Sequence, residues 1–535
     1  MTHSNPEVIQ ASLPIEQRKT AAAMSLAWPL ARTDLWLAGI LGFGALLLYI
    51  RTLAPSLLWG DSAEFQTLSY TLGMTHPSGY MTQIMIGKLF TYLPVGNIAY
   101  RVNLMSAFFG AMTVAQIYLL VRMLGGISIS GISAALMLGL IPLFWRNALV
   151  AESYATAAGM ITTIWLLFLY WRKTRKWQPL FLAGLAGGLS VGIHSTVVMT
   201  AASVIVIMLI TSRKRAEWVG ATSGALLGIL ITFSFFLFLD HHNPPSSIYN
   251  TTFLPAHSSE GRLTSDFDTP VKRFFTIFPA DHFWSYYFSA SAAETDRRLA
   301  EYLSFHPLWS LAFILIGVVA LFKDNWRDAL YPAVAFLIIW GFAVTVAFSI
   351  YQEFYTPVAV FMFVWYGYGV SRLFEAMTQF LSQRQIAVKS AQIMISAVLV
   401  ALPLWQFRTD LSAGIQSGYT TFVRRDHLYP VFAPDKAIHD ALKIVDRVED
   451  NAIVFTDWDK LYSYVYTAHI EEGRTGIDFH LALFDDEIRI SESTLAYIDD
   501  NIDRRPVYFA VFLPELSEYF QVKQLNQYLY RVYRK

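Results

Sequence analysis

The 535-residue chain contains no cysteine. This absence excludes disulfide bonds, thiolate metal sites and cysteine nucleophiles, although it does not identify a cellular compartment. Charged residues are also scarce, at 15% of the chain, and 40 Lys and Arg balance 40 Asp and Glu. A balanced net charge gives no support to nucleic-acid binding, so we expect no nucleic-acid partner.

Several common site motifs are missing as well. The sequence has no GxxxxGK[ST] phosphate loop, no GxGxxG after a strand, no GxSxG and no HExxH. Residues 1–33 also lack the short apolar core and the small-residue cleavage site of a removable signal peptide. We expect these residues to form a cytoplasmic N-terminal tail.

Apolar residues, in contrast, are abundant. They make up 55% of the chain, and the mean hydropathy of +0.40 is far above that of a soluble protein. Runs of about 20 apolar residues predict a polytopic membrane protein with about eleven spans within residues 34–406. The predicted spans are 34–52, 104–122, 127–145, 150–171, 179–195, 196–212, 217–239, 307–323, 329–350, 354–374 and 388–406.

The positions of the basic residues predict the topology. Short cytoplasmic loops are enriched in Lys and Arg, and with the N-terminus inside, the predicted inner loops are basic. These residues are Arg172, Lys173, Arg175, Lys176, Arg213, Lys214, Arg215, Lys323, Arg327, Arg372, Arg384 and Lys389. An odd number of spans then places a first outer loop (53–103), an outer insertion (240–305) and the C-terminal tail on the non-cytoplasmic side.

The composition changes in the tail, residues 407–535. Apolar runs shorten to strand length, as in AIVFT (452–456) and PVYFAVFL (506–513), and Pro434 and Asp435 are placed to begin a helix. The sequence therefore predicts a mainly α fold, a helical membrane bundle with a small C-terminal α/β domain on the non-cytoplasmic side.

The first outer loop carries two acids three residues apart, Asp61 and Glu64. On a helix this spacing places both carboxylates on one face, and ionisable groups beside a membrane often mark function. Paired carboxylates suit a general base that deprotonates a hydroxyl. The alternative is helix capping, with Asp61 or Ser62 as N-cap and Glu64 in the first turn.

A third acid, Glu152, stands at the expected outer start of a span, where Arg146 could pair with it in a purely structural salt bridge. His76, Arg101, Arg146 and His194 are the cations expected on the same side, where they could hold a phosphate head group. Each also has a structural alternative: Arg101 could reach to the interface, and His194 could satisfy a carbonyl at a helix bend.

Six sequence segments resemble one known family. WGDSAEF (59–65), MTHPSGY (74–80) and LPVGNIAYRVN (93–103) follow the D-S-G-E-F, H-P-P-G-Y and L-P-x-G-N-x-A-x-R-x-N patterns of protein O-mannosyltransferase-like membrane proteins. AESYATAA (151–158), the segment 350–369 and the tail segment 452–474 agree with the same family. The resemblance covers most of the chain.

The resemblance implies a GT-C glycosyltransferase fold, in which the first outer loop holds the catalytic aspartate. Asp61 matches that aspartate, Glu64 is its companion, and Glu152 is the acid of the second motif. His76 and Tyr80, from the H-P-P-G-Y-like turn, join the expected substrate-binding residues. Protein O-mannosyltransferases have adjacent Asp and Glu, whereas Ser62 and Ala63 separate them here, so either acid could be the base.

The resemblance therefore implies an inverting transferase that moves mannose or a similar hexose from a polyprenyl-phosphate donor to a hydroxyl, as in protein O-glycosylation. The expected partners are this donor, a protein or glycan acceptor and membrane lipid. No cofactor is expected; carboxylates could hold a divalent metal, but relatives of this kind generally need none. A bacterial inner membrane with a periplasmic active site is the expected location. A lipid-linked-sugar transporter or flippase and a non-catalytic subunit that retains the fold are the alternatives.

Overall fold

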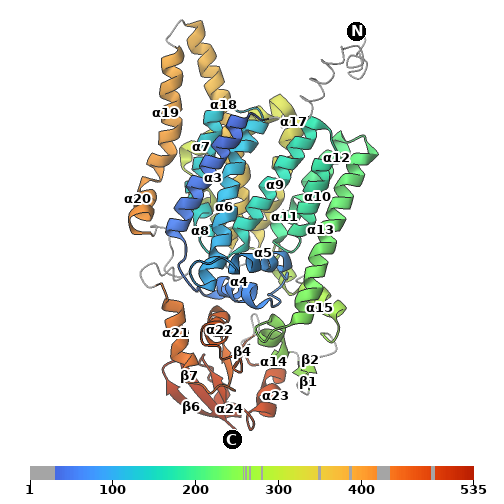
Figure 1. The fold of residues 1–535 in the computed structure, drawn as a ribbon, viewed down its shortest axis with the longest axis vertical. Coiled ribbons are helices and arrows are strands. Elements are labelled where there is room, and N and C mark those ends of the chain that lie inside the picture. Colours follow the sequence, from blue (N-terminus) through green and yellow to red (C-terminus); the bar gives the residue numbers. More distant parts are fainter. Residues whose placement is uncertain are drawn as a thin grey trace.

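The computed structural model describes residues 30–256, 258–259, 262–263, 267–278, 281–347, 351–384, 388–418, 434–483 and 489–535. A bundle of long helices carries a small unit with a sheet at one end (Figure 1). The predicted fold class, mainly helical with a small C-terminal α/β part, is confirmed. Most of the expected tail 1–33 lies outside the described residues.

The long helices run along the bundle axis. They are α3 (Arg32–Thr52), α6 (Ile98–Met123), α7 (Ser128–Leu140), α9 (Ser153–Thr174), α10 (Gln178–Ser190), α12 (Ala201–Thr211), α13 (Arg215–His242), α17 (Leu308–Thr345), α18 (Tyr355–Gln383) and α19 (Val388–Gln406). The shorter helices α8 (Pro142–Asn147) and α11 (Ser195–Met199) lie between them, and α20 (Arg408–Ser417) follows α19.

Among the described residues, six helices are long and apolar enough to cross a membrane: α3, α6, α9, α13, α17 and α19. Two shorter apolar stretches, Ser128–Leu140 and Ser195–Thr211, accompany them. The backbone of α17 leaves the helical conformation at Asn325, which divides this 38-residue element into two helical halves. The chain is an integral multi-pass membrane protein, and the total of eleven spans stays a prediction.

Helices α10 and α13 pack with their backbones in unusually close contact. A Cβ atom on Gly224 of α13 would lie 2.0 Å from the carbonyl oxygen of Phe181, and one on Gly188 of α10 would lie 2.3 Å from that of Ala225. Glycine at these positions permits the approach, as small residues commonly do between membrane helices.

The first outer loop forms two short helices, α4 (Gly60–Thr71) and α5 (Met81–Thr91), which lie across the end of the bundle nearest the C-terminal unit (Figure 1). Helix α6 begins at Ile98, so the end of the expected 53–103 loop is already helical. Asn97 caps this helix by accepting the backbone N–H of Tyr100 at 2.8 Å.

The insertion 240–305 contains several short elements. They are η1 (Tyr249–Phe253), α14 (Leu254–Ala256), β1 (Ser258–Ser259), β2 (Arg262–Leu263), α15 (Pro270–Ile277), η2 (Asp281–Tyr286) and α16 (Ala292–Ser304). A further short helix, η3 (Tyr351–Phe354), precedes α18.

The C-terminal unit is built on a five-stranded sheet of order β4-β3-β5-β7-β6. Its strands are β3 (Ile453–Thr456), β4 (Asp478–Leu481), β5 (Val507–Phe509), β6 (Gln521–Asn526) and β7 (Leu529–Tyr533). Its helices are α21 (Lys436–Val445), α22 (Trp458–Val465), η5 (Tyr466–Glu471), α23 (Glu492–Asn501) and α24 (Leu516–Tyr519). The central strand β3 is parallel to β4 and β5, with Ile453 opposite Asp478 and Val507, and β7 is antiparallel to β5 and β6.

A single apolar core joins the first outer loop to this unit. Buried side chains of α4 and α5, such as Phe65 and Ile84, cluster with Tyr462 and Val465 of α22. Helix α22 packs directly against α4. The first loop is therefore enclosed between the bundle and the C-terminal unit, and the burial of apolar surface holds the two parts together.

Candidate active site

Asp61 lies in the first turn of α4, and its carboxylate is half-buried. The N-cap of this helix is Trp59, which makes no side-chain capping bond, so neither Asp61 nor Ser62 caps it. The Oδ1 atom of Asp61 accepts the indole N–H of Trp458 at 2.8 Å. Its Oδ2 atom makes no hydrogen bond with any residue that the structure describes, so this oxygen could accept a proton.

Glu64, one turn later, is fully buried. Its Oε1 atom accepts the backbone N–H of His76 at 2.8 Å, and its Oε2 atom pairs with Nδ1 of the same histidine. Burial raises the pKa of Glu64. Burial also opposes a charge on His76, but the carboxylates of Glu64 and Asp61 outweigh it and raise the pKa of His76 to about 9. His76 is therefore expected to be an imidazolium at neutral pH.

Three of the expected substrate-binding residues form an aromatic wall beside the acids. The ring of Tyr80 packs against His76 at 5.0 Å and against His194 at 6.3 Å between centroids. Tyr80 has a φ of +35° at the start of α5, where its ring meets Phe65 edge-on at 5.1 Å. The ring of Tyr154 continues the wall, 4.9 Å from His194.

His194 also has a structural role. It is the N-cap of α11, and its Nδ1 atom accepts the backbone N–H of Thr196 at 3.2 Å. The expected alternative placed His194 on a carbonyl, whereas the structure places it on a backbone N–H. Because Nδ1 accepts, the other ring nitrogen carries the proton in neutral His194.

Glu152 immediately precedes α9 and approaches the acids of α4. Its Oε1 atom accepts the hydroxyl of Ser62 at 2.9 Å. The carboxylates of Asp61 and Glu353 and the imidazole of His76 interact with Glu152 electrostatically. The structure thus brings the three predicted acids and His76 together, although it does not test their roles.

Arg146 does not pair with Glu152, so that structural alternative is wrong. Its guanidinium donates to Oε1 of Glu353 at 2.9 Å, and Asn147 donates to the other oxygen of Glu353 at 2.6 Å. The Nε atom of Arg146 is buried without a hydrogen-bond partner among the described residues. Arg146 reaches the acids through Glu353, a residue that the sequence analysis did not single out.

Arg101 lies apart from the three predicted acids and His76. Its guanidinium donates to three backbone carbonyls in the turn between α5 and α6, those of Thr91 at 2.9 Å, Val95 at 2.8 Å and Gly96 at 3.0 Å. Arg101 therefore fixes this turn, and the structure does not bring it to the other predicted substrate-binding residues.

The other polar residues of the same motif also make structural contacts. Asn103 accepts from the side chain of Gln66 at 2.8 Å and donates to the carbonyl of Ala54 at 2.9 Å. Gln66 in turn accepts the backbone N–H of Leu58 at 3.0 Å. These bonds join α4, α6 and the chain that enters α4, so the motif holds the loop that carries the acids.

Trp458 and Tyr462 of the C-terminal unit complete the surroundings of the acids. The indole of Trp458 contacts the His76 ring edge-on at 5.7 Å, and the phenol of Tyr462 interacts with Glu64 electrostatically. Both residues stand in the 452–474 segment that carries the resemblance, but no local pattern shows which residue meets an acid so far away in the chain.

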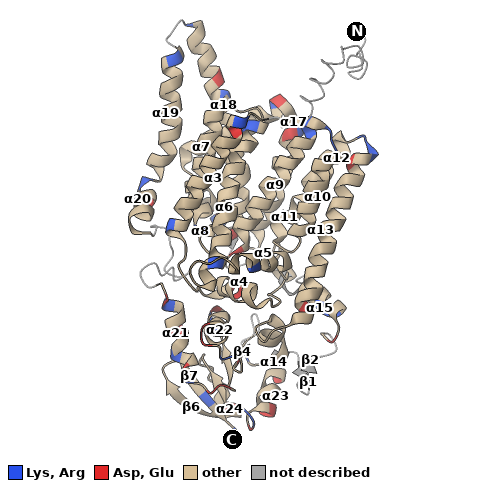
Figure 2. Ribbon diagram, viewed as in Figure 1, with Lys and Arg blue, Asp and Glu red and all other residues tan. Residues whose placement is uncertain are grey.

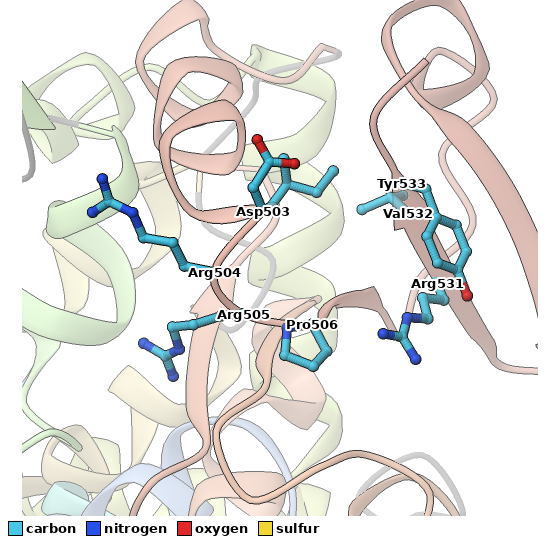
Figure 3. Close-up of a pocket in the computed structure, with 8 residues that line it drawn as sticks. Asp503, Arg504, Arg505, Pro506, Arg531, Val532 and Tyr533 are labelled. Atoms are coloured by element: carbon cyan, nitrogen blue, oxygen red, sulfur yellow. The ribbon is translucent and has the colours of Figure 1, made fainter.

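Two further observations concern a possible metal site and a pocket away from the acids. Within the described part of the chain, no three His, Asp or Glu side chains form a group able to hold a metal ion, and metal dependence stays untested. A pocket of about 200 Å³ opens where β5 begins and β7 ends, beside Pro506 and Tyr533 (Figure 3). Two of its arginines are already paired, Arg505 with Asp478 and Arg531 with Glu449.

Residues 61–217 match the family model of the protein O-mannosyl-transferase TMEM260 N-terminal domain. The mouse (Mus musculus) protein O-mannosyl-transferase TMEM260 is 27% identical over 259 residues, which are 47% of this chain and 35% of that protein. The resemblance to protein O-mannosyltransferase-like proteins is confirmed. The matched residues include Asp61, Glu64 and Glu152, the three predicted acids, and His76 beside them.

A second TMEM260 relative, from Dictyostelium discoideum, is 24% identical over 135 residues, or 25% of this chain and 16% of that protein. The chain thus matches about a third or less of the length of these curated relatives.

Two solved structures share the fold. ArnT from Cupriavidus metallidurans, bound to undecaprenyl phosphate, superposes with a TM-score of 0.55 at 12% identity, over 94% of this chain and 98% of that one. An oligosaccharyltransferase from Archaeoglobus fulgidus gives a TM-score of 0.51 at 12% identity, over 88% of this chain and 68% of that one. The residues that match this family model therefore lie in a chain whose fold is similar to that of these two GT-C structures.

Proposed function

We propose that this protein is a membrane glycosyltransferase that moves mannose or a similar hexose from a polyprenyl-phosphate donor to an acceptor hydroxyl. One observation carries the proposal. The half-buried carboxylate of Asp61 has one oxygen without a partner among the described residues, and it lies at the start of α4 between the bundle and the C-terminal unit. The likeness of the fold to ArnT, whose structure contains undecaprenyl phosphate, supports a lipid-linked donor.

Asp61 is the better candidate for the general base. Glu64 is fully buried, and both of its oxygens are occupied by His76. In the proposed reaction Asp61 accepts the proton of the acceptor hydroxyl, and the hydroxyl oxygen forms a bond to the anomeric carbon. The bond from that carbon to the phosphate oxygen breaks, the polyprenyl phosphate leaves with its negative charge, and the configuration inverts.

His76 is the cation that could stabilise the leaving phosphate. The pair with Glu64 keeps it charged, and its ring stands among the acids and the aromatic wall. Glu353 already neutralises much of the charge of Arg146. Arg101 is engaged with backbone carbonyls. The Tyr80 and His194 rings would then border the sugar, and Glu152 would support the acids through Ser62.

The outer face of the membrane is the proposed side of the reaction. Lys and Arg gather at the end of the bundle opposite α4 and the C-terminal unit, for example around the turn between α12 and α13 (Figure 2). Basic loop ends favour the cytoplasmic side. In a bacterial inner membrane, the acids and the C-terminal unit would then face the periplasm, where a protein or glycan acceptor is available.

The test is transfer of radiolabelled sugar by the purified full-length protein from polyprenyl-phosphate-sugar donors extracted from membranes. Asp61→Asn should lower kcat by about 10²- to 10⁴-fold, the usual contribution of a general base. Glu64→Gln should mainly weaken donor binding, because His76 loses the carboxylate that keeps it charged. Asp500→Asn, which alters an exposed carboxylate on α23, is the matched control and should transfer normally.

The opposite results would be equally informative. If Glu64→Gln abolishes transfer while Asp61→Asn is active, the assignment of the base is wrong. If the wild type transfers no sugar from any donor and Asp61→Asn complements a deletion strain, the glycosyltransferase proposal is wrong. A transporter or a non-catalytic subunit then becomes the better explanation.

A further inference from the structure

The acids of the first outer loop meet a helix from the far end of the chain. The indole N–H of Trp458 donates to Oδ1 of Asp61 across 397 residues of sequence. The same indole contacts the ring of His76 edge-on. One tryptophan of the C-terminal unit therefore touches both the proposed base and the proposed phosphate-stabilising cation.

The next turn of the same helix repeats the pattern. Tyr462 follows Trp458 by four residues, so both side chains project from one face of α22. The phenol of Tyr462 interacts with Glu64 electrostatically, and its backbone carbonyl accepts the hydroxyl of Thr67 at 3.3 Å. Two aromatic residues of α22 are thus matched to the two acids on α4.

The local structure fixes the start of α22 against the start of α4. Strand β3 is fully buried, and Asp457, which follows it, caps α22 by accepting the backbone N–H of Lys460 at 3.1 Å. Gly60 has a φ of +57°, and a Cβ atom there would lie 3.7 Å from Oδ1 of Asp459. The backbone that carries Asp61 therefore runs close beside the first turn of α22.

We infer that the C-terminal unit completes the catalytic site, and that Trp458 is the positioning residue that orients Asp61. The inference rests on the proposed function of Asp61 as base. With Oδ1 held by the indole N–H, the carboxylate cannot rotate freely, and Oδ2 is presented to the acceptor hydroxyl. The C-terminal unit is thus part of the reaction centre as well as a possible acceptor-binding module.

Trp458→Phe tests this role because it keeps an aromatic ring and removes the N–H donor. A hydrogen bond to a charged group has a strength that corresponds to roughly a 10- to 100-fold change in rate. We expect a loss in kcat of that size, with little change in the KM for the polyprenyl-phosphate-sugar donor.

Tyr464→Phe is the matched control. It removes a hydroxyl from the same helix, and the ring of Tyr464 faces Phe479 in the core of the C-terminal unit. Its transfer rate should equal that of the wild type. Full transfer by Trp458→Phe would overturn the inference, and so would an equal loss in the two variants, which would indicate general damage to α22.

A double-mutant cycle on thermal stability keeps the inference testable without catalysis. The fall in melting temperature for Asp61→Ala with Trp458→Phe should be smaller than the sum of the two single falls, because each single variant removes one partner of the same hydrogen bond. Additive falls would overturn the inference. Failure of the proposed function would instead show as absence of transfer by the wild type, whatever the cycle reports.

Discussion

The ion pair between His76 and Glu64 should make the stability of the protein depend on pH above neutrality. The pKa of His76 is raised to about 9 from an ordinary value of 6.5. The imidazole is only 16% exposed, so solvent screens the pair weakly. The difference of about 2.5 pH units corresponds to about 3 kcal/mol of folding free energy.

The direction follows from proton binding. The folded state binds the His76 proton more tightly than the unfolded state does, so the imidazolium stabilises the fold. This contribution is complete below pH 6.5, declines as the unfolded state alone loses the proton, and is lost once the pH passes about 9. Raising the pH from 6.5 to 10 should therefore remove about 3 kcal/mol that His76 supplies.

The measurement is reversible unfolding in mixed micelles, followed by circular dichroism between pH 6.5 and 10. The wild type is compared with Glu64→Gln/His76→Gln, in which both partners of the pair are neutral. The difference in unfolding free energy should shrink by about 3 kcal/mol across this range. His242→Gln, at an exposed imidazole, is the control. A difference between wild type and double variant that stays constant with pH would refute the reasoning.

Two further predictions concern packing and the turn after α5. Gly224→Ala should destabilise the protein by about 1–3 kcal/mol, because its Cβ would meet the carbonyl of Phe181. Gly187→Ala on α10, where a Cβ would meet nothing within 4 Å, should leave the melting temperature unchanged or raised. Arg101→Gln should lower the melting temperature without raising the KM for the donor, since its bonds go to backbone carbonyls. A raised KM with an unchanged melting temperature would return Arg101 to the substrate site.

The sequence was a good guide where local pattern decides the structure. The apolar runs predict the long helices, and the strand-length runs at 452–456 and 506–513 contain β3 and β5. Asp61 and Glu64 lie on one helix, as their spacing suggests. Their position near Glu152 agrees with the expectation that all three acids lie on the same side of the membrane.

The choice of partners could not be predicted in the same way. Sequence proximity suggests Glu152 as the partner of Arg146, but the fold brings Glu353 closer. The charge of Arg101 suggests a phosphate ligand. Its guanidinium instead bonds a backbone carbonyl at the end of α5, where carbonyls have no partner within the helix. The contact of Trp458 with Asp61 depends on how a whole sheet unit docks, and no short-range signal encodes it.

The separation of Asp61 and Trp458 also has a consequence for the order of synthesis. The acids of α4 are made early, whereas α22 follows only after the last bundle helix, α19, has been translated. A chain interrupted before residue 458 would thus carry the membrane bundle and all three acids without Trp458, the residue that we propose to orient Asp61. The contact between Trp458 and Asp61 would form only in a late step, when α22 docks against α4.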